Sequence, residues 1–157
     1  MLTLTVYQDT QQDRDRIATY PLSDPTFTAT PQMALTIAIG NPDRLPLMIL
    51  EDTELVGFLV LIKNEDVREV GADPATAILI RSLSISETQR GRGVATEVLQ
   101  RLPEFVRQRF PAATTLVLAV DHGNFPAQKL YEKSGYTDTG RRRFGPYGKQ
   151  YILTQTV

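Results

Sequence analysis

A strand-like run that passes through a glycine turn into an amphipathic helix is the feature that most constrains how this chain can fold. The run AILIRSLSIS occupies residues 77–86, and the turn QRGRGVA follows at residues 89–95. Beyond the turn, apolar residues recur at helical spacing: they are Val94, Val98, Leu99, Leu102, Phe105 and Val106. Pro103 interrupts this stretch, and we expect it to kink the helix or to make it restart. A strand followed directly by such a helix predicts helices packed against a sheet.

Shorter strand and helix signals surround this segment. Alternating or continuous β-type residues predict strands, which we place at residues 2–8, 46–51, 54–63, 77–86 and 114–121, with a final hairpin around GPYG. Capping and stop residues predict helices, which we place at residues 13–20, at 31–39 after Thr30, and from Asn124 to Lys133 before Gly135. Residues 20–31 and 64–74 are expected to form loops. Because no repeat or linker interrupts this order, we expect one α+β domain over residues 1–157.

Charge and composition exclude several classes of function. The 157 residues are 41% hydrophobic, which is enough to bury a core without metal or disulfide crosslinks. A total of 17 Lys and Arg against 18 Asp and Glu gives a net charge of −1, so we expect no nucleic-acid partner. The absence of Cys and the single His exclude thiolate nucleophiles and Cys-rich or His-rich metal sites, and we expect no metal. No stretch reads as a signal peptide or a membrane span, so we expect a cytoplasmic protein without a membrane partner.

The turn at residues 89–95 has features of an anion-binding site. A strand that leads into a helix through glycines presents unpaired backbone N–H groups at the positive end of the helix dipole. Gly91 and Gly93 let an anion approach the backbone, while Arg90 and Arg92 add positive charge. The turn is not a Walker loop, because no Lys-Ser or Lys-Thr follows it, and the dinucleotide-binding pattern lacks its third glycine. These residues alone fit a phosphate site, an RNA-binding RG tract or an ordinary glycine-rich helix start.

A second segment, NFPAQKLYEKSGY at residues 124–136, decides among these alternatives. Together the two segments resemble the GNAT superfamily of N-acetyltransferases. The acetyl-CoA signature of that family is Gln or Arg, two residues, Gly, one residue, and Gly or Ala, and here it reads Arg90, Gly93 and Ala95. The second motif is Asn-x-x-Ala-x-x-x-Tyr-x-x-x-Gly-aromatic, and here it reads Asn124, Ala127, Tyr131, Gly135 and Tyr136. The resemblance implies an α+β fold of the GNAT acyl-CoA N-acyltransferase type, whose central mixed, mostly antiparallel sheet has about seven strands and flanking helices.

The resemblance also implies acetyl-CoA as co-substrate and indicates its binding residues. The pyrophosphate lies against the backbone amides of the turn, with Arg90 adding charge; these amides belong to Gly91, Arg92, Gly93, Val94, Ala95 and Thr96. The pantetheine arm enters where the strands at 77–86 and 114–121 separate, and it pairs with the backbone of Leu83 and Ile85, on either side of Ser84. Asn124 hydrogen-bonds the arm and also caps its helix, and Ala127 belongs to the same motif.

Tyr131 matches the position of the family's general acid, which protonates the departing thiolate of coenzyme A. A phenol with a pKa of about 10 is protonated at neutral pH; without the motif it reads as a core aromatic residue on a helix face. An amine attacks the thioester directly, with a strand N–H polarising the carbonyl oxygen. Many relatives carry a Glu on the strand before the turn as general base, but AILIRSLSIS has no carboxylate. The base is left open among Glu51, Asp52, Glu54, Asp73, His122 and a water relay from Ser82 and Ser84.

The function implied by the resemblance is an N-acetyltransferase that acts on a primary amine of a small molecule, peptide or protein. The alternative is a non-catalytic GNAT-like module that binds acetyl-CoA, which the missing strand carboxylate favours. A third hypothesis, nucleic-acid binding through QRGRG and Arg141–Arg143, conflicts with the near-neutral charge. We expect at most two of these three arginines to share a strand face. The acceptor pocket is expected from residues 20–45 and the terminal hairpin, and both a monomer and a homodimer fit the sequence.

Overall fold

The computed structural model of the chain describes residues 1–22 and 27–157. Part of the loop expected at residues 20–31 therefore lies outside the described residues. The described chain forms two compact units, which are Met1–Leu61 with Arg81–Val98, and Ile62–Ile80 with Leu99–Val157. The boundaries fall inside β3 (Glu54–Ile62), β4 (Ala77–Ile85) and α3 (Val94–Arg109), so each of these elements contributes residues to both units. The expectation of one domain stays a prediction.

The first unit is built on an antiparallel sheet. β1 (Leu2–Val6) pairs with β2 (Arg44–Glu51) from Leu2↔Glu51 to Val6↔Leu47. The turn between β2 and β3 places Asp52 at φ +56°, a left-handed conformation that Asp tolerates in tight turns. β2 and β3 are neighbours in the sheet, which confirms the expected hairpin. The core side chains of these two strands are fully buried and include Met48, Ile49, Phe58 and Leu59.

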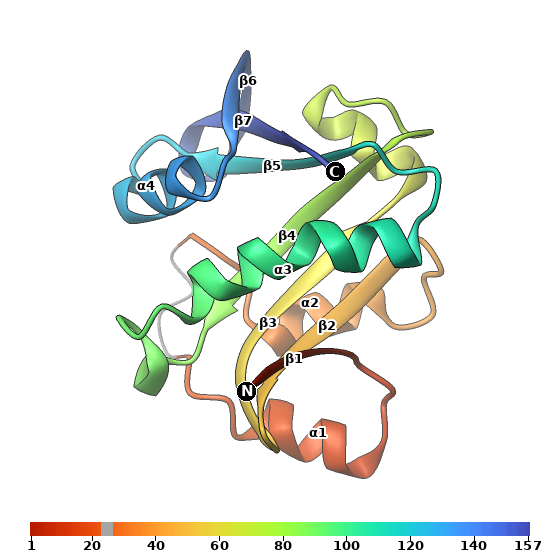
Figure 1. The fold of residues 1–157 in the computed structure, drawn as a ribbon, viewed down its shortest axis with the longest axis vertical. Helices are drawn as coiled ribbons and strands as arrows, with labels where there is room; N and C mark the ends of the chain where they lie inside the picture. The colour runs from red at the N-terminus through yellow and green to blue at the C-terminus, as the bar shows by residue number, and fades with distance from the viewer. Residues whose placement is uncertain (23–26) are drawn as a thin grey trace. The chain divides into compact units, whose positions relative to one another are not determined.

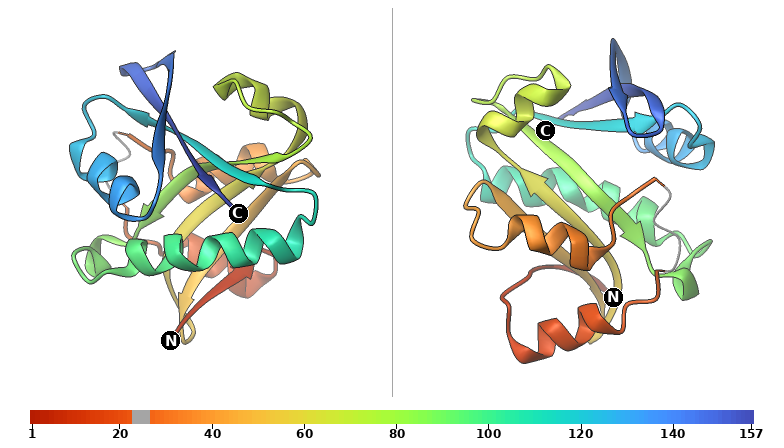
Figure 2. Two further views of the ribbon diagram at one scale, coloured as in Figure 1. Left: turned by 45° about the horizontal axis from the view of Figure 1, so that its top comes forward. Right: turned by 180° about the vertical axis from the view of Figure 1, so that it is seen from behind.

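Two short helices belong to the first unit, and both begin where a Thr side chain caps them. α1 (Gln11–Ala18) starts earlier than expected, because Thr10 Oγ1 accepts a hydrogen bond from the Asp13 amide at 3.1 Å. α2 (Pro31–Ala38) starts as expected, since Thr30 Oγ1 accepts a hydrogen bond from the Met33 amide at 3.3 Å. α2 packs on β2, and α1 packs against α2, as Figure 1 and Figure 2 show.

The second unit contains β5 (Thr115–Asp121), α4 (Phe125–Lys133) and a terminal hairpin of β6 (Thr137–Gly145) and β7 (Gly148–Thr156), which Figure 1 shows. β7 pairs antiparallel with β5 from Thr115↔Thr156 to Asp121↔Gln150, and the start of β4 pairs with β5 in parallel. Within the described residues the strand order is β1-β2-β3-β4-β5-β7-β6. This mixed, mostly antiparallel sheet of seven strands with flanking helices confirms the expected fold class.

The structure differs from two local expectations, which are the loop at residues 64–74 and a helix restart at Pro103. The loop expected at residues 64–74 contains η1 (Asn64–Val70), a 3₁₀ helix that buries Val67 and Val70 and packs on β5. The spacing of these valines matches the three-residue period of a 3₁₀ helix, but charged neighbours conceal it in the sequence. α3 runs through Pro103 without restarting. Its fully buried side chains, Leu99, Leu102 and Val106, lie on both sides of the proline, and their burial offsets the backbone hydrogen bond that Pro103 cannot donate.

Within residues 1–22 and 27–157, no helix is long and apolar enough to cross a membrane.

Candidate functional site

The glycine turn between β4 and α3 is shaped by two left-handed residues. After the short 3₁₀ turn η2 (Glu87–Gln89), Gly91 has φ +77° and Gly93 has φ +79°, a region that L side chains rarely adopt. A Cβ atom at either position would meet no described atom within 4 Å. The backbone conformation therefore favours glycine here, and the space above both residues is open.

The first turn of α3 supplies backbone amides next to these glycines. Glu97 N donates to Gly93 O at 3.1 Å, which is the first hydrogen bond of the helix. The amides of Val94, Ala95 and Thr96 precede this bond, so the helix itself offers them no acceptor. They also lie at the positive end of the helix dipole. This end of α3 is therefore suited to an anion.

The two arginines of the turn are exposed. Arg92 NH1 donates to Gln89 Oε1 at 2.6 Å, which holds this guanidinium close to the turn. The charge of Arg90 lowers the pKa of Tyr20, a tyrosine of the same unit. Both arginines add positive charge around the open glycines, as the sequence predicts.

β4 carries a left-handed residue just before the segment that is expected to bind the pantetheine arm. Its parallel pairing with β5 covers Ala77↔Thr115 to Leu79↔Val117, and three residues further along the chain Ser82 has φ +58°. A non-glycine residue in this region is uncommon and stores backbone strain. Such a residue also interrupts the regular alternation of side chains that would place Ser82 and Ser84 on one face of the strand.

A tyrosine that the sequence did not single out lies against this part of β4. The Tyr20 hydroxyl is 3.0 Å from Ser84 Oγ, and Ser84 is 6% exposed. Burial raises the pKa of Tyr20 to about 12, although the hydrogen bond from Ser84 and the charge of Arg90 act in the opposite direction. Glu87 N also donates to Pro21 O at 3.0 Å, which fastens the same segment to the end of β4. No periodic or capping pattern marks Tyr20, so only the structure reveals this pair.

In the second unit, Asn124 caps α4 as the sequence predicts. Its Oδ1 accepts a hydrogen bond from Ala127 N at 3.3 Å, and its own amide donates to Asp121 O at 3.0 Å. Ala127, Leu130 and Tyr131 are half-buried and share one face of the helix. The cap uses only the oxygen of the Asn124 side chain, so its Nδ2 donor is not needed for helix formation.

Tyr131 has the properties of a proton donor. Burial raises the pKa of its phenol to about 12, so the hydroxyl is protonated at neutral pH. Its ring meets the ring of Tyr136 edge-to-face, and Tyr136 N donates to Tyr131 O at 3.0 Å. Gly135, at φ +93°, follows the end of α4 and lets the chain turn back so that the Tyr136 amide reaches Tyr131 O. The second motif therefore positions Tyr131 through a helix cap at each end.

The predicted cofactor residues are divided between the two units. Leu83 to Thr96 lie in the first unit, whereas Asn124, Ala127 and Tyr131 lie on or next to α4 in the second. Within each unit the residues that the sequence groups together are neighbours in the structure.

The carboxylates considered as general base lie in turns or at the surface. Asp52 is 86% exposed and lies 3.8 Å from the N-terminal amine, and Glu54 is exposed as well. Asp73 Oδ1 accepts a hydrogen bond from Ala75 N at 2.9 Å and so stabilises a turn. Glu51 is half-buried and borders, together with Glu97, an open pocket of about 100 Å³. Three of these four residues thus have the surface position of ordinary turn residues.

His122 lies at the end of β5 and is exposed. Its Nδ1 is 2.9 Å from Lys149 O, a distance at which Nδ1 carries the proton and donates it to the carbonyl. The ring also packs near Gly148, where a Cβ atom would come within 3.1 Å of His122 Cε1. His122 therefore stabilises the junction between β5 and the hairpin.

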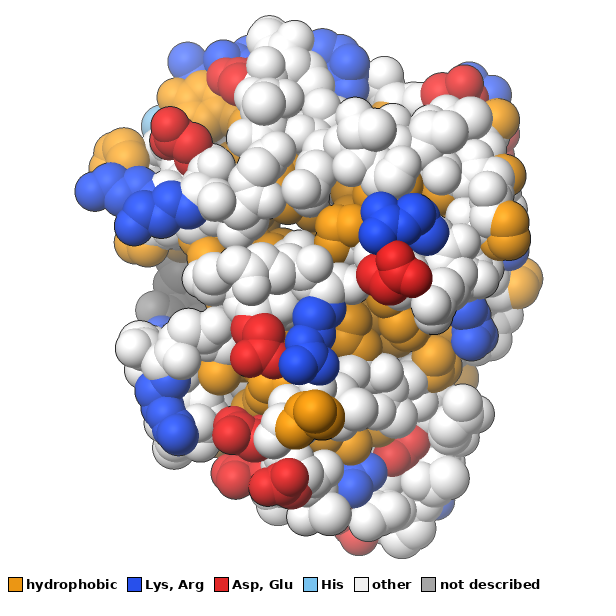
Figure 3. Space-filling model, viewed as in Figure 1, with side chains coloured by type: hydrophobic (Ala, Val, Ile, Leu, Met, Phe, Trp, Pro, Cys, Tyr) orange, Lys and Arg blue, Asp and Glu red, His pale blue; other side chains and the backbone are white. Residues whose placement is uncertain are grey.

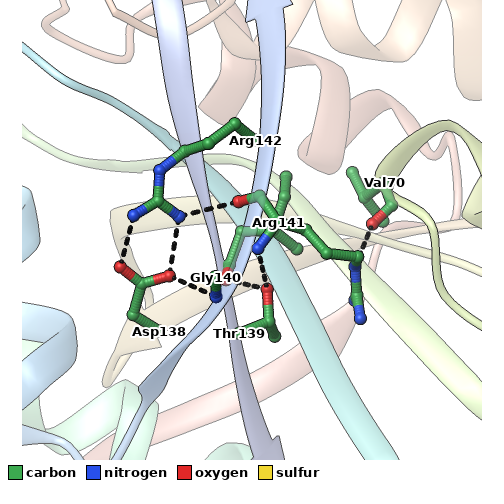
Figure 4. A network of polar contacts seen from close by, with 7 residues as sticks. Val70, Asp138, Thr139, Gly140, Arg141 and Arg142 are labelled. Atoms are coloured by element: carbon green, nitrogen blue, oxygen red, sulfur yellow. Dashed lines mark hydrogen bonds and ion pairs between the residues drawn. The ribbon is translucent and has the colours of Figure 1, made fainter.

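The run Arg141–Arg143 is engaged within the second unit. Arg142 donates to both carboxylate oxygens of Asp138, at 2.8 and 2.9 Å, and lies 4.5 Å from the centroid of the Tyr151 ring. Arg141 Nε donates to Val70 O at 3.3 Å, as Figure 4 shows. Arg143 donates to Gln150 Oε1 at 2.9 Å and lies near Glu69.

These contacts confirm that at most two of the three arginines share a face, since Arg141 and Arg143 both contact η1 and Arg142 does not. On the face that Figure 3 shows, basic and acidic side chains are interspersed. The arginine run thus stabilises the hairpin.

Known proteins resemble this chain in sequence and in fold. A sequence model described as the acetyltransferase (GNAT) family matches residues 7–136. The chain is 37% identical over 152 residues to the uncharacterized N-acetyltransferase YbbJ of Bacillus subtilis (strain 168), and the match covers 97% of this chain and 95% of YbbJ.

Two solved structures illustrate the likeness in fold. One is the aminoglycoside acetyltransferase AAC(6')-Ib in complex with coenzyme A and kanamycin, with a TM-score of 0.77 and 20% identity over 99% of this chain and 95% of that chain. The other is spermidine N-acetyltransferase from Vibrio cholerae in complex with CoA and spermine, with a TM-score of 0.68 and 16% identity over 99% of this chain and 95% of that chain.

Proposed function

The chain belongs to the acetyltransferase (GNAT) family, and from this we infer that it transfers the acetyl group of acetyl-CoA directly to a primary amine of a small molecule, peptide or protein. The observation that carries the proposal is the open, left-handed glycine turn at the start of α3. It has the residues of the family's acetyl-CoA signature and the backbone geometry that an anion requires.

The turn is proposed to bind the pyrophosphate of coenzyme A. The amides of the first turn of α3 and the positive end of its dipole favour a negative group, and the two arginines add attraction over a longer range. Because no side chain stands above Gly91 and Gly93, a phosphate can approach the backbone directly. The residues assigned to this part of the site are Arg90, Gly91, Arg92, Gly93, Val94, Ala95 and Thr96.

The pantetheine arm is proposed to pair with the backbone of Leu83 and Ile85, next to Ser84, in the manner of an added strand. The short parallel pairing of β4 supports this, since it ends at Leu79, well before these residues. Asn124 is proposed to donate its Nδ2 to a carbonyl of the arm, while its Oδ1 caps α4. Ala127 is small and half-buried on the same helix, so it leaves room for the arm.

The transfer itself needs one bond formed and one broken. The amine nitrogen attacks the thioester carbonyl carbon, the C–N bond forms, and the C–S bond breaks. Tyr131 is proposed to give its phenolic proton to the departing thiolate, a role supported by the raised pKa that keeps it protonated. The amine nitrogen loses one N–H proton as the amide forms, and the Tyr131 phenolate recovers a proton from solvent.

The second candidate is a module that binds acetyl-CoA without turnover, which the lack of a carboxylate on β4 favours. Free thiol release can be followed with acetyl-CoA and a panel of amines comprising spermine, kanamycin and a short peptide with a free N-terminus. Thiol release above the rate without amine supports the enzyme. Tight calorimetric binding of acetyl-CoA without thiol release for every amine supports the module. A monomer or homodimer and a cytoplasmic location stay predictions.

A further inference from the structure

We propose that Ser84 and Tyr20 form a hydroxyl relay that removes the proton of the acceptor amine, an inference that rests on the proposed acetyltransferase function. The relay supplies the acceptor for a proton in a chain whose β4 carries no carboxylate. It belongs to the first unit alone, since both residues and their contacts lie there.

The geometry connects a buried hydroxyl to a more exposed one. Ser84 Oγ and Tyr20 Oη are 3.0 Å apart, a hydrogen bond between residues that are 64 positions apart in the chain. Ser84 is 6% exposed, whereas Tyr20 is half-buried and lies on the surface segment after α1. A proton that reaches Ser84 therefore has a path outward through Tyr20.

Ser84 lies where a reacting amine would need an acceptor. It stands between Leu83 and Ile85, whose peptide groups are proposed to align the pantetheine arm. Peptide groups of a strand lie in the plane of the sheet, and side chains project perpendicular to it. Because an amine attacks a carbonyl carbon from above the carbonyl plane, a side chain that projects from the sheet at Ser84 belongs to one of the two sides from which the amine can approach.

The protons and bonds of the relay balance. One N–H proton of the attacking amine passes to Ser84 Oγ, the proton of Ser84 passes to Tyr20 Oη, and the proton of Tyr20 passes to water. The C–N bond forms, the C–S bond breaks, and the thiolate takes its proton from Tyr131. The products are an amide and coenzyme A, and both hydroxyls are regenerated without carrying a charge.

A relay is required rather than a single base because the Tyr20 phenol is neutral at physiological pH. Burial raises its pKa to about 12, so it exchanges protons and does not accumulate as phenolate. Among the described residues, the charged group that acts on it is Arg90, whose charge lowers the pKa of Tyr20. The charge of Arg90 thereby makes it easier for Tyr20 to release its proton to water.

The test compares Ser84→Ala and Tyr20→Phe with the wild type between pH 6 and 10, using acetyl-CoA and the fastest amine of the panel. We expect kcat at pH 7 to fall about 100-fold for Ser84→Ala and about 10-fold for Tyr20→Phe, within or just below the usual range for lost acid–base catalysis. The KM for acetyl-CoA stays constant. The deficit shrinks toward pH 10, since hydroxide becomes an alternative acceptor for the N–H proton that the relay removes.

Two matched variants separate the relay from a structural role. Ser84→Thr keeps the hydroxyl and is expected to retain most of the activity. Tyr7→Phe removes the same atom from another hydrogen-bonded tyrosine of the first unit, whose hydroxyl is 2.9 Å from Asp9 Oδ1, and is expected to leave kcat and its pH profile unchanged. Thermal unfolding of each variant shows whether the fold is kept.

The possible failures are distinguishable. An active wild type together with unchanged kcat and pH profile in Ser84→Ala and Tyr20→Phe overturns the relay and leaves the proposed function standing. An equal loss of activity at every pH, with lowered thermal stability and no recovery in Ser84→Thr, assigns the pair a structural role and also overturns the relay. A wild type that binds acetyl-CoA but releases no thiol overturns the proposed function, and the relay with it.

Discussion

The ring of Tyr131 meets the ring of Tyr136 edge-to-face, with centroids 5.8 Å apart and planes inclined by 67°. Such a pair holds both rings in a fixed orientation. Tyr136 is 3% exposed, and burial, followed by the nearby Tyr131, raises its pKa. The Tyr136 hydroxyl has no hydrogen-bond partner within the described part of the chain. The buried Tyr136 ring thus helps to hold the Tyr131 ring in place.

Replacing Tyr131 by Phe tests its role as the acid. The substitution keeps the ring contact with Tyr136 and removes only the proton donor, so we expect kcat to fall about 100-fold while the Kd for acetyl-CoA changes little. Because the acid must be protonated and its pKa is about 12, loss of this proton should not limit the wild-type rate below about pH 11. Steady-state kinetics and calorimetry measure both quantities.

The matched control is Tyr136→Phe, which makes the same chemical change on the neighbouring ring. It removes a buried hydroxyl without a described partner, so we expect unchanged kcat and no loss of thermal stability. Equal kcat in wild type and Tyr131→Phe would remove Tyr131 from the acid role.

Gly93→Asp is expected to weaken acetyl-CoA binding more than tenfold, which corresponds to about 1.4 kcal/mol. The substitution places a carboxylate in the open space where the pyrophosphate is proposed to lie, and it strains a residue at φ +79°. Gly140→Asp is the control, since Gly140 has φ +83° and equally open surroundings on β6. Calorimetric titration should show weaker binding for the first variant alone; equal affinities would place the pyrophosphate elsewhere.

Asn124 allows its two proposed roles to be separated. Asn124→Ala removes both the cap and the Nδ2 donor, so we expect a loss of about 1 kcal/mol in unfolding free energy together with weaker acetyl-CoA binding. Asn124→Asp keeps a capping oxygen at the start of α4 but has no donor, so stability should be retained while affinity falls. Chemical denaturation and calorimetry report the two effects, and wild-type affinity in Asn124→Asp would leave Asn124 a cap only.

The Asp138 carboxylate links the stability of the terminal hairpin to pH. Its pKa is lowered by the hydrogen bonds from Arg142 and from the Gly140 amide. A group whose folded pKa is depressed stabilises the protein above its unfolded pKa, about 3.9 for Asp, and loses this contribution as pH falls through the folded value. Asp138→Asn should therefore lower the thermal midpoint slightly at pH 7 and leave it unchanged near pH 2. The same difference at both pH values would contradict the assignment.

Local signals account for most of what could be predicted. Thr30 caps α2 and Asn124 caps α4 because each side chain bonds an amide three residues away, so neighbours in sequence suffice to mark the helix starts. The apolar runs of β2 and β5 are strands since they are buried on both faces, which the sequence shows as continuous hydrophobicity. Where polar neighbours mask the buried positions, as in η1, the same reasoning fails.

By itself the sequence determined the order of strands and helices, the glycine turn at Gly91 and Gly93, and the placement of Tyr131 on a capped helix, because each depends on interactions within a few residues. Only the tertiary structure decided that Ser82 adopts a left-handed conformation and that Tyr20 hydrogen-bonds Ser84. Strain at a serine persists only where packing around it enforces the backbone. A hydrogen bond across 64 positions depends on how distant segments are brought together, which no local propensity encodes.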